Sequence, residues 1–176
     1  MIKAVKHFFG LRKLKSVIAL AVCFILWQGI RLIFPRLEVI PIYAFLYSVI
    51  EMRKTIEQSK ITAISRIKVT VIGFSIAFIS IGVENSLSNF EFASRYISLI
   101  ELLLILIGVL IAINIAEAMR CGALCAFAAT TFIICFLHTA YNPYIYSFLR
   151  FVQTIMGVGV ALLVNLFIFK PASDSD

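Results

Sequence analysis

This chain of 176 residues is 62% hydrophobic and only 14% charged, which is far more apolar sequence than one soluble domain of this length can bury. The composition therefore excludes a soluble globular protein and predicts an integral membrane protein, whose surplus apolar surface faces lipid. The net charge of +7 does not indicate nucleic-acid binding, because the basic residues lie between apolar segments, where the positive-inside rule accounts for them.

Apolar segments separated by polar links recur along the chain. Since a membrane-spanning helix needs about 20 mostly apolar residues, these segments predict an all-α protein with six transmembrane helices. The segments are residues 16–34, 39–52, 67–83, 97–116, 122–136 and 148–169, followed by a polar tail at 171–176. The second segment is short and contains Pro41, so we expect it to be broken or tilted. If it were re-entrant, the number of crossings would be five.

The distribution of charge predicts the orientation. The N-terminal region and the link after the second segment are rich in Lys and Arg, whereas the link containing Glu84 and Glu91 is slightly acidic. Basic links remain in the cytoplasm. Six crossings with both termini in the cytoplasm satisfy this pattern, and the chain is predicted to lie in the cell membrane.

The third and sixth segments share the pattern R-x3-T-x2-G-x3-A. It comprises Arg66, Thr70, Gly73 and Ala77 in one segment and Arg150, Thr154, Gly157 and Ala161 in the other. Offsets of 0, 4, 7 and 11 fall within about 60° of one another on an α-helix, so each helix carries one stripe. Each arginine opens the third helix of a three-helix group. A repeat with an odd number of crossings enters its second copy from the opposite side, which predicts two inverted repeats at about residues 12–83 and 96–170.

The stripes hold the candidate site residues. The four small residues are best explained by close helix packing. The polar members, Arg66, Thr70, Arg150 and Thr154, are candidates for lining a substrate path. Arg66 also fits a simple positive-inside charge, and Arg150 also fits a side chain that snorkels to the headgroups.

Other polar residues give weaker indications. Glu101 lies in the fourth segment, either as an ordinary charge near the outer end or as a proton-coupling group. All four cysteines lie in apolar stretches and are interpreted as small buried hydrophobic residues. The sequence contains no catalytic motif and no metal-ligand spacing. We therefore expect neither an enzyme nor a cofactor.

Three stretches resemble a known family. The ending RFVQTIMGVGVALLVNLFIFKP, the opening LRKLKSVIALAV and the stretch SRIKVTVIG are similar to the last, first and third helices of the aromatic acid exporter and fusaric acid resistance superfamily. The plant aluminium-activated malate transporters are distant members of this superfamily. The resemblance covers most of the chain from Leu11 to Pro171 and implies a six-helix membrane module.

The chain also departs from the family pattern. The family commonly has Arg-x-x-Gly-Thr-x-x-Gly in its third helix; Arg66, Thr70 and Gly73 match this, but Val69 stands where Gly is usual. A Gln-Pro-Thr often closes the family's second helix, whereas the chain has residues 53–55 (Arg-Lys-Thr) there, without proline. These departures affect the residues that would handle substrate.

The resemblance implies a transporter or channel for organic anions, aromatic acids included, that works in efflux. Because the chain is a single family module, we expect a homodimer in the lipid bilayer. Two other functions fit the composition: a substrate-binding membrane subunit of a multi-protein uptake transporter, and a non-transporting membrane scaffold or holin. A stable homo-oligomer without an ATPase would favour the exporter, and a required ATPase would favour the uptake subunit.

The predicted topology can be tested by labelling single introduced cysteines in intact cells. Asp176→Cys and Ser88→Cys should react from opposite sides of the membrane with an impermeant thiol reagent, because three crossings separate the two positions. Labelling of both positions from one side would contradict the six-crossing topology and the inverted repeat together.

Overall fold

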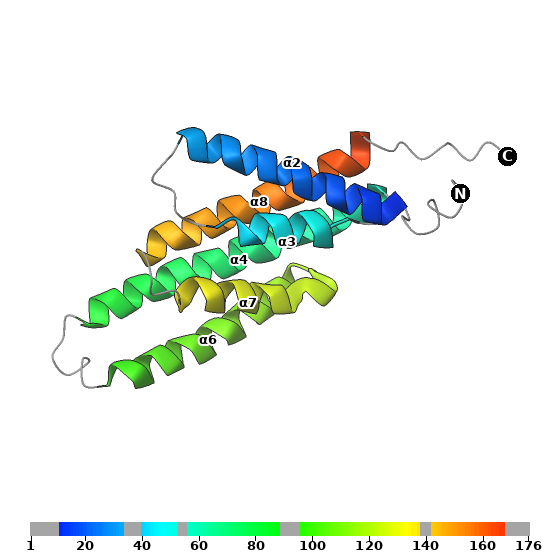
Figure 1. Cartoon of the computed structure of the whole chain (residues 1–176). Helices are drawn as coiled ribbons and strands as arrows, with labels where there is room; N and C mark the ends of the chain where they lie inside the picture. Colours follow the sequence, from blue (N-terminus) through cyan, green and yellow to red (C-terminus); the bar gives the residue numbers. More distant parts are fainter. Residues whose placement is uncertain (1–10, 34–39, 53–55, 89–95, 138–141, 168–176) are drawn as a thin grey trace, which may run out of the picture. The chain divides into compact units, whose positions relative to one another are not determined.

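The computed structural model describes residues 11–33, 40–52, 56–88, 96–137 and 142–167 (Figure 1). All regular structure within these ranges is helical, which confirms the predicted all-α class, and it includes six α-helices. The helices are α2 (Leu11–Ile33), α3 (Ile42–Ile50), α4 (Ile56–Ser88), α6 (Ile97–Ala118), the 3-10 turn η1 (Gly122–Leu124), α7 (Cys125–Phe136) and α8 (Pro143–Phe167). The predicted tail at 171–176 and the ends of the first and last predicted segments lie outside the described residues.

Four of these helices, α2, α4, α6 and α8, are long and apolar enough to cross a membrane. This supports the membrane-protein class. The other two are short: α3 has 9 residues and α7 has 12. At 1.5 Å per residue, α3 is about 14 Å long, roughly half the thickness of the hydrocarbon core. The segment containing Pro41 is therefore too short to span the membrane as one straight helix, and the same holds for α7, which is about 18 Å long.

Helix α4 is longer than the sequence suggested. It begins at Ile56 and ends at Ser88, so part of the predicted polar link is helical. Glu57 lies in its first turn, where a carboxylate favours the positive end of the helix dipole. A stripe of buried residues with heptad-like spacing also continues through this region. The stripe consists of Ser59, Ala63, Arg66, Thr70, Gly73, Ala77 and Ser80.

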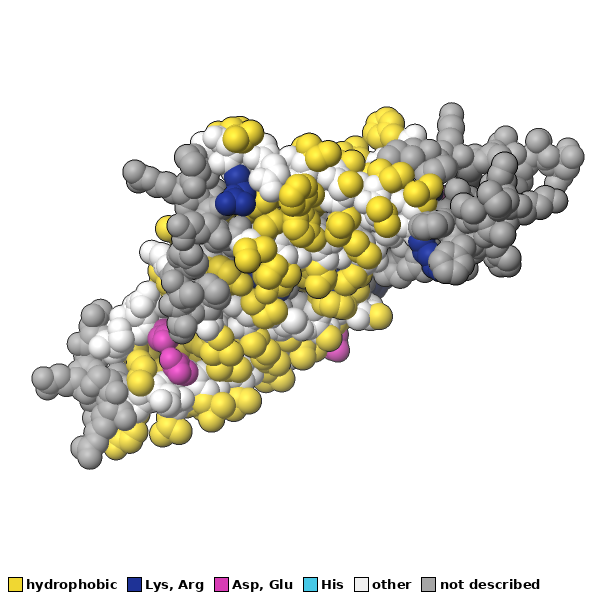
Figure 2. All heavy atoms as spheres, viewed as in Figure 1, with side chains coloured by type: hydrophobic (Ala, Val, Ile, Leu, Met, Phe, Trp, Pro, Cys, Tyr) yellow, Lys and Arg dark blue, Asp and Glu magenta, His cyan; other side chains and the backbone are white. Residues whose placement is uncertain are grey.

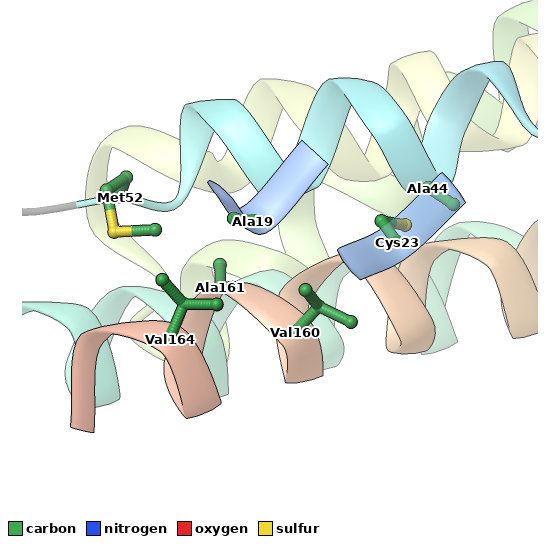
Figure 3. Close-up of a cluster of buried hydrophobic side chains, with 7 residues drawn as sticks. All are labelled: Ala19, Cys23, Ala44, Met52, Val160, Ala161 and Val164. Atoms are coloured by element: carbon green, nitrogen blue, oxygen red, sulfur yellow. The ribbon is translucent and has the colours of Figure 1, made fainter. Parts of the chain in front are cut away.

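The chain forms two compact units. The first contains α2, α3, the start of α4 up to Ile64, and α8 from Gln153 onward. Helices α2 and α3 form an antiparallel hairpin (Figure 1). Side chains of this hairpin and of α8, most of them small, fill its core (Figure 3). The core residues are Ala19, Cys23, Ala44, Met52, Val160, Ala161 and Val164.

The second unit is continuous in sequence, from Ser65 to Val152. Helices α6 and α7 form an antiparallel hairpin whose turn places Arg120 and Gly122 at positive φ, 55° and 59°. A core of Ala77, Ile81, Phe132, Cys135 and Phe136 packs α4 against α7. Within this core the rings of Phe132 and Phe136 stack with their centroids 5.6 Å apart.

In each unit, a glycine of one helix lies very close to the backbone of another helix. In the second unit, a Cβ built on Gly73 of α4 would lie 2.5 Å from the carbonyl oxygen of Ala128 in α7. In the first unit, a Cβ on Gly157 of α8 would lie 2.4 Å from the carbonyl oxygen of Ala44 in α3. Both obstructing atoms belong to helical backbone, so a larger residue could fit only if the helices separated.

The exterior is apolar. On the face shown in Figure 2, hydrophobic side chains cover most of the described surface, and charged side chains form only a few small groups. Helix α6 is an extreme case, since large residues along its whole length are exposed; they include Leu99, Leu102, Leu103, Leu106, Leu110 and Ile115. Monomeric soluble proteins rarely expose a continuous apolar surface of this extent. A bilayer solvates it without penalty.

The glycine contacts predict a paired stability result. Gly157→Ala and Gly73→Ala should each destabilise the protein by about 1–3 kcal/mol, because the added methyl group collides with backbone. Gly159→Ala is the matched control, since nothing lies within 4 Å of a Cβ at that position. It should be neutral or slightly stabilising, as alanine usually is in a helix. Thermal unfolding in detergent can be followed with a thiol-reactive dye, which reports exposure of the buried Cys23, Cys121 and Cys135. Equal melting temperatures for Gly157→Ala and Gly159→Ala would contradict the close contact.

Candidate functional site

Arg66 lies inside the protein, on the buried stripe of α4, with 1% of its surface exposed. Its guanidinium carbon is 3.9 Å from the centroid of the Phe127 ring in α7, the geometry of a cation–π interaction. A positive-inside charge that served only topology would point to water or headgroups. The position of Arg66 against an aromatic ring is instead that of a cation held within the helix bundle.

Arg150 is also buried, with 3% of its surface exposed, and occupies the corresponding stripe on α8. One turn earlier, the hydroxyl of Ser147 donates a hydrogen bond of 3.4 Å to the carbonyl oxygen of Cys135, near the end of α7. The side chain of Arg150 is therefore buried among helices. Its burial does not support the alternative that it snorkels to a headgroup.

The two arginines occupy separate places in the second unit. Arg66 contacts α7 at Phe127, near the start of that helix, whereas the turn before Arg150 contacts α7 at Cys135, near its end. Eight residues of helix separate these two contacts, about 12 Å along the axis. The structure therefore contains two buried cationic positions and not one shared cluster.

The threonines of the stripes are buried as well, each 1% exposed. The hydroxyl of Thr70 donates a 2.8 Å hydrogen bond to the carbonyl oxygen of Arg66, one turn earlier in the same helix. The hydroxyl proton of Thr70 is therefore engaged within the helix. The hydroxyl oxygen can still accept a hydrogen bond from another group. Gly73 and Gly157 lie at the close helix contacts, and Ala77 and Ala161 are buried in the cores of their units.

Glu101 has a partner that the sequence did not indicate. Its side chain lies close to that of Glu84, near the end of α4. Close by, the amide of Asn85 donates a 3.3 Å hydrogen bond to the hydroxyl of Tyr144. Glu84 lies near the end of α4 and Glu101 near the start of α6.

The first unit contains a polar chain that sequence reasoning missed. The ammonium of Lys15 donates to Oδ1 of Asn165 at 2.8 Å, and the amide of Asn165 donates to Oγ of Ser59 at 2.7 Å. These two hydrogen bonds connect α2, α8 and α4. The sequence signal is a single asparagine within an apolar run, which must find partners when it is buried.

Glu51, at the end of α3, is another residue that the sequence reading did not select. It is 2% exposed, although it opens a strongly polar stretch. A nearly fully buried carboxyl group in a membrane protein is a functional candidate. Among the described residues, no group of three or more His, Cys, Asp or Glu could hold a metal ion.

A constant displacement relates the two halves of the chain. Arg66 and Arg150 are 84 residues apart, and the same shift carries α3 onto residues 126–134, inside α7, and α2 onto residues 95–117, nearly the span of α6. It also carries Ala44 onto Ala128 and Gly73 onto Gly157. The two close glycine contacts therefore join pairs of residues that differ by this shift of 84 positions.

Helices α4 and α8 run in opposite directions where they are neighbours. Phe74 of α4 stacks on the ring of Phe151 in α8 within the second unit, with centroids 5.4 Å apart. In the second unit, Phe78 of α4 packs edge-on against Tyr144 at the start of α8, with ring centroids 4.8 Å apart. Comparison of the chain with protein-family models, curated proteins and solved structures gives no match.

The cation–π geometry predicts that the ring of Phe127 stabilises the buried Arg66. Phe127→Leu should lower the free energy of unfolding by about 2 kcal/mol, the value of such a contact when it is desolvated. Phe127→Tyr keeps the ring and should lose much less. In an Arg66→Gln background the cost of Phe127→Leu should fall, which a double-mutant cycle of unfolding in detergent would measure. An unchanged cost in that background would show that the ring acts only by filling space.

Proposed function

We propose that this membrane protein is a transporter or channel for organic anions, aromatic acids included, that works in efflux. The observation that carries the proposal is the burial of two arginines at corresponding places on α4 and α8, 1% and 3% exposed, in a chain with very few charges among its apolar segments. A cation inside a membrane protein costs several kcal/mol and is retained mainly where it handles an anion, a proton or a partner charge.

The arrangement of the helices supports an inverted repeat. The third helices of the two proposed repeats, α4 and α8, are antiparallel neighbours in the second unit. Each third helix makes its close glycine contact with the second helix of the other repeat, at Ala128 in one case and Ala44 in the other. A reciprocal contact of this kind is expected for two copies related by a two-fold axis. In transporters built on inverted repeats, the substrate site lies at the interface of the repeats.

On this proposal the chain crosses the cell membrane six times, with both termini in the cytoplasm, and forms a homodimer. Helices α3 and α7 are the second helices of the two proposed repeats, and both are short. Each repeat would therefore contain one helix shorter than the hydrocarbon core, at the same position. Arg66 would then supply positive potential toward the cytoplasmic side of the path and Arg150 toward the outer side. The departures of the chain from the family's motifs leave the substrate open within the class of organic anions.

Two carboxyl sites are candidates for coupling transport to protons. Glu101 lies close to Glu84, and Glu51 is the more buried group, at 2% exposure. Both belong to helices of the proposed repeats. The alternatives to a transporter, a scaffold or holin and a subunit of an uptake complex, have no observation in the structure that favours them.

The test is transport by the purified chain in proteoliposomes. Efflux of a panel of radiolabelled aromatic and aliphatic acids should exceed that from empty vesicles for at least one acid, without an ATPase or ATP. Transport that appears only when an ATPase partner is added would favour the uptake-subunit alternative. No transport of any acid by a folded, monodisperse preparation would contradict the proposal.

The arginines predict the variant results. Arg150→Gln should reduce transport by about ten- to a hundredfold, because a charge-assisted hydrogen bond to a carboxylate contributes about 1.5–3 kcal/mol. Arg150→Lys should retain part of the activity, and Arg66→Gln should weaken transport from the cytoplasmic side.

The exposed Arg120 provides the matched control, since Arg120→Gln removes a cation that lies outside the buried stripes. Expression and melting temperature should be measured for every variant. Normal transport by a well-folded Arg66→Gln, Arg150→Gln double variant would contradict the hypothesis that the two stripes line the substrate path.

A further inference from the structure

A pocket of about 230 Å³ lies within the first unit, between the last turns of α2 and the start of α3. Four of its lining residues, Phe24, Trp27, Gln28 and Arg31, have helical offsets of 0, 3, 4 and 7 and therefore share one face of α2. The other wall consists of Ile40, Pro41 and Phe45. None of the lining residues that the structure describes is acidic.

Among the described lining residues, three polar side chains are suited to an anion. Arg31 carries a permanent positive charge, and the amide of Gln28 can donate. Trp27 is 3% exposed, and its indole N–H has no acceptor among the residues that the structure describes. A buried donor without an acceptor costs about 1–3 kcal/mol, so a ligand oxygen in the pocket would relieve a penalty.

The location of the pocket indicates where such an anion comes from. Arg31 lies in the last turn of a helix long enough to cross the membrane, which is the depth of lipid headgroups. Two lining residues, Phe24 and Ile40, are also exposed on the apolar exterior, 50% and 68%. The pocket therefore opens toward the surface that acyl chains cover, and a ligand with an anionic head and apolar tails fits both parts.

We propose that this pocket binds the anionic headgroup of a phospholipid, with its phosphate at Arg31, Gln28 and Trp27 and its acyl chains along the apolar exterior of α2. Aromatic rings such as those of Phe24 and Phe45, whose centroids are 6.1 Å apart, can also hold a choline cation. The guanidinium of Arg31 opposes a cation and favours a headgroup with net negative charge. The site is independent of the proposed transport.

The chain has a built-in reporter for this site, because Trp27 is its only tryptophan. The full chain is reconstituted in phosphatidylcholine vesicles that contain a small fraction of either phosphatidylglycerol or phosphatidylcholine with brominated acyl chains. Bromine quenches tryptophan fluorescence at short range. We expect stronger quenching by brominated phosphatidylglycerol than by brominated phosphatidylcholine, corresponding to an approximately fivefold preference for the anionic lipid. This preference equals about 1 kcal/mol, the attraction of one basic residue to anionic headgroups.

Arg31→Gln should abolish the preference, and Gln28→Glu, which places a carboxylate in the pocket, should reverse it. Lys60→Gln is the matched control, because it removes an exposed cation from the same unit outside the pocket and should change nothing. The melting temperature of each variant identifies any that fails to fold; since either substitution alone tests the charge, one folded variant is sufficient.

Three results would overturn the proposal. One is equal quenching by the two brominated lipids or stronger quenching by phosphatidylcholine. Another is a preference that survives in Arg31→Gln or Gln28→Glu. The third is displacement of the brominated anionic lipid by millimolar benzoate, which would assign the pocket to a soluble organic acid. Loss of transport in proteoliposomes has no bearing on any of these readouts.

Discussion

The fold depends on two places where helices approach until backbone meets backbone. Gly73 against Ala128 and Gly157 against Ala44 leave no room for a side chain at either glycine. In a membrane, apolar side chains gain little from leaving lipid, so such close van der Waals packing is a principal source of helix association. Small residues around both contacts, such as Ala161 in the first unit and Ala77 in the second, allow the approach to continue along the helices.

Close packing also explains how the chain accommodates its charges. The heptad-like stripes that contain the glycines also contain Arg66 and Arg150, so the residues that make contact and those that carry charge lie on the same helix faces. A charge there is shielded from lipid on every side by protein. Phe127 provides one such shield through the negative face of its ring, 3.9 Å from the guanidinium carbon of Arg66.

Much of the fold could be predicted from the sequence, because apolar length and the 3.6-residue period are local properties. The all-α class, the number of helices and the stripes on α4 and α8 follow from them. The start of α4 was missed because polarity was interpreted as a link, although buried small residues keep the helical period there. Three features could not be predicted, since each depends on residues far apart in sequence. They are the contact of Arg66 with Phe127, the bond between Asn165 and Ser59, and the burial of Glu51.

The division of the chain between the two units has a consequence for its synthesis. The second unit is one uninterrupted stretch, Ser65 to Val152, and its close glycine contact is complete once α7 has left the ribosome. The first unit is discontinuous: Ala44 is made early, but Gly157 follows more than a hundred residues later. The contact surface of the α2–α3 hairpin therefore stays unfilled until α8 has been made, so the first unit can be completed only after the second.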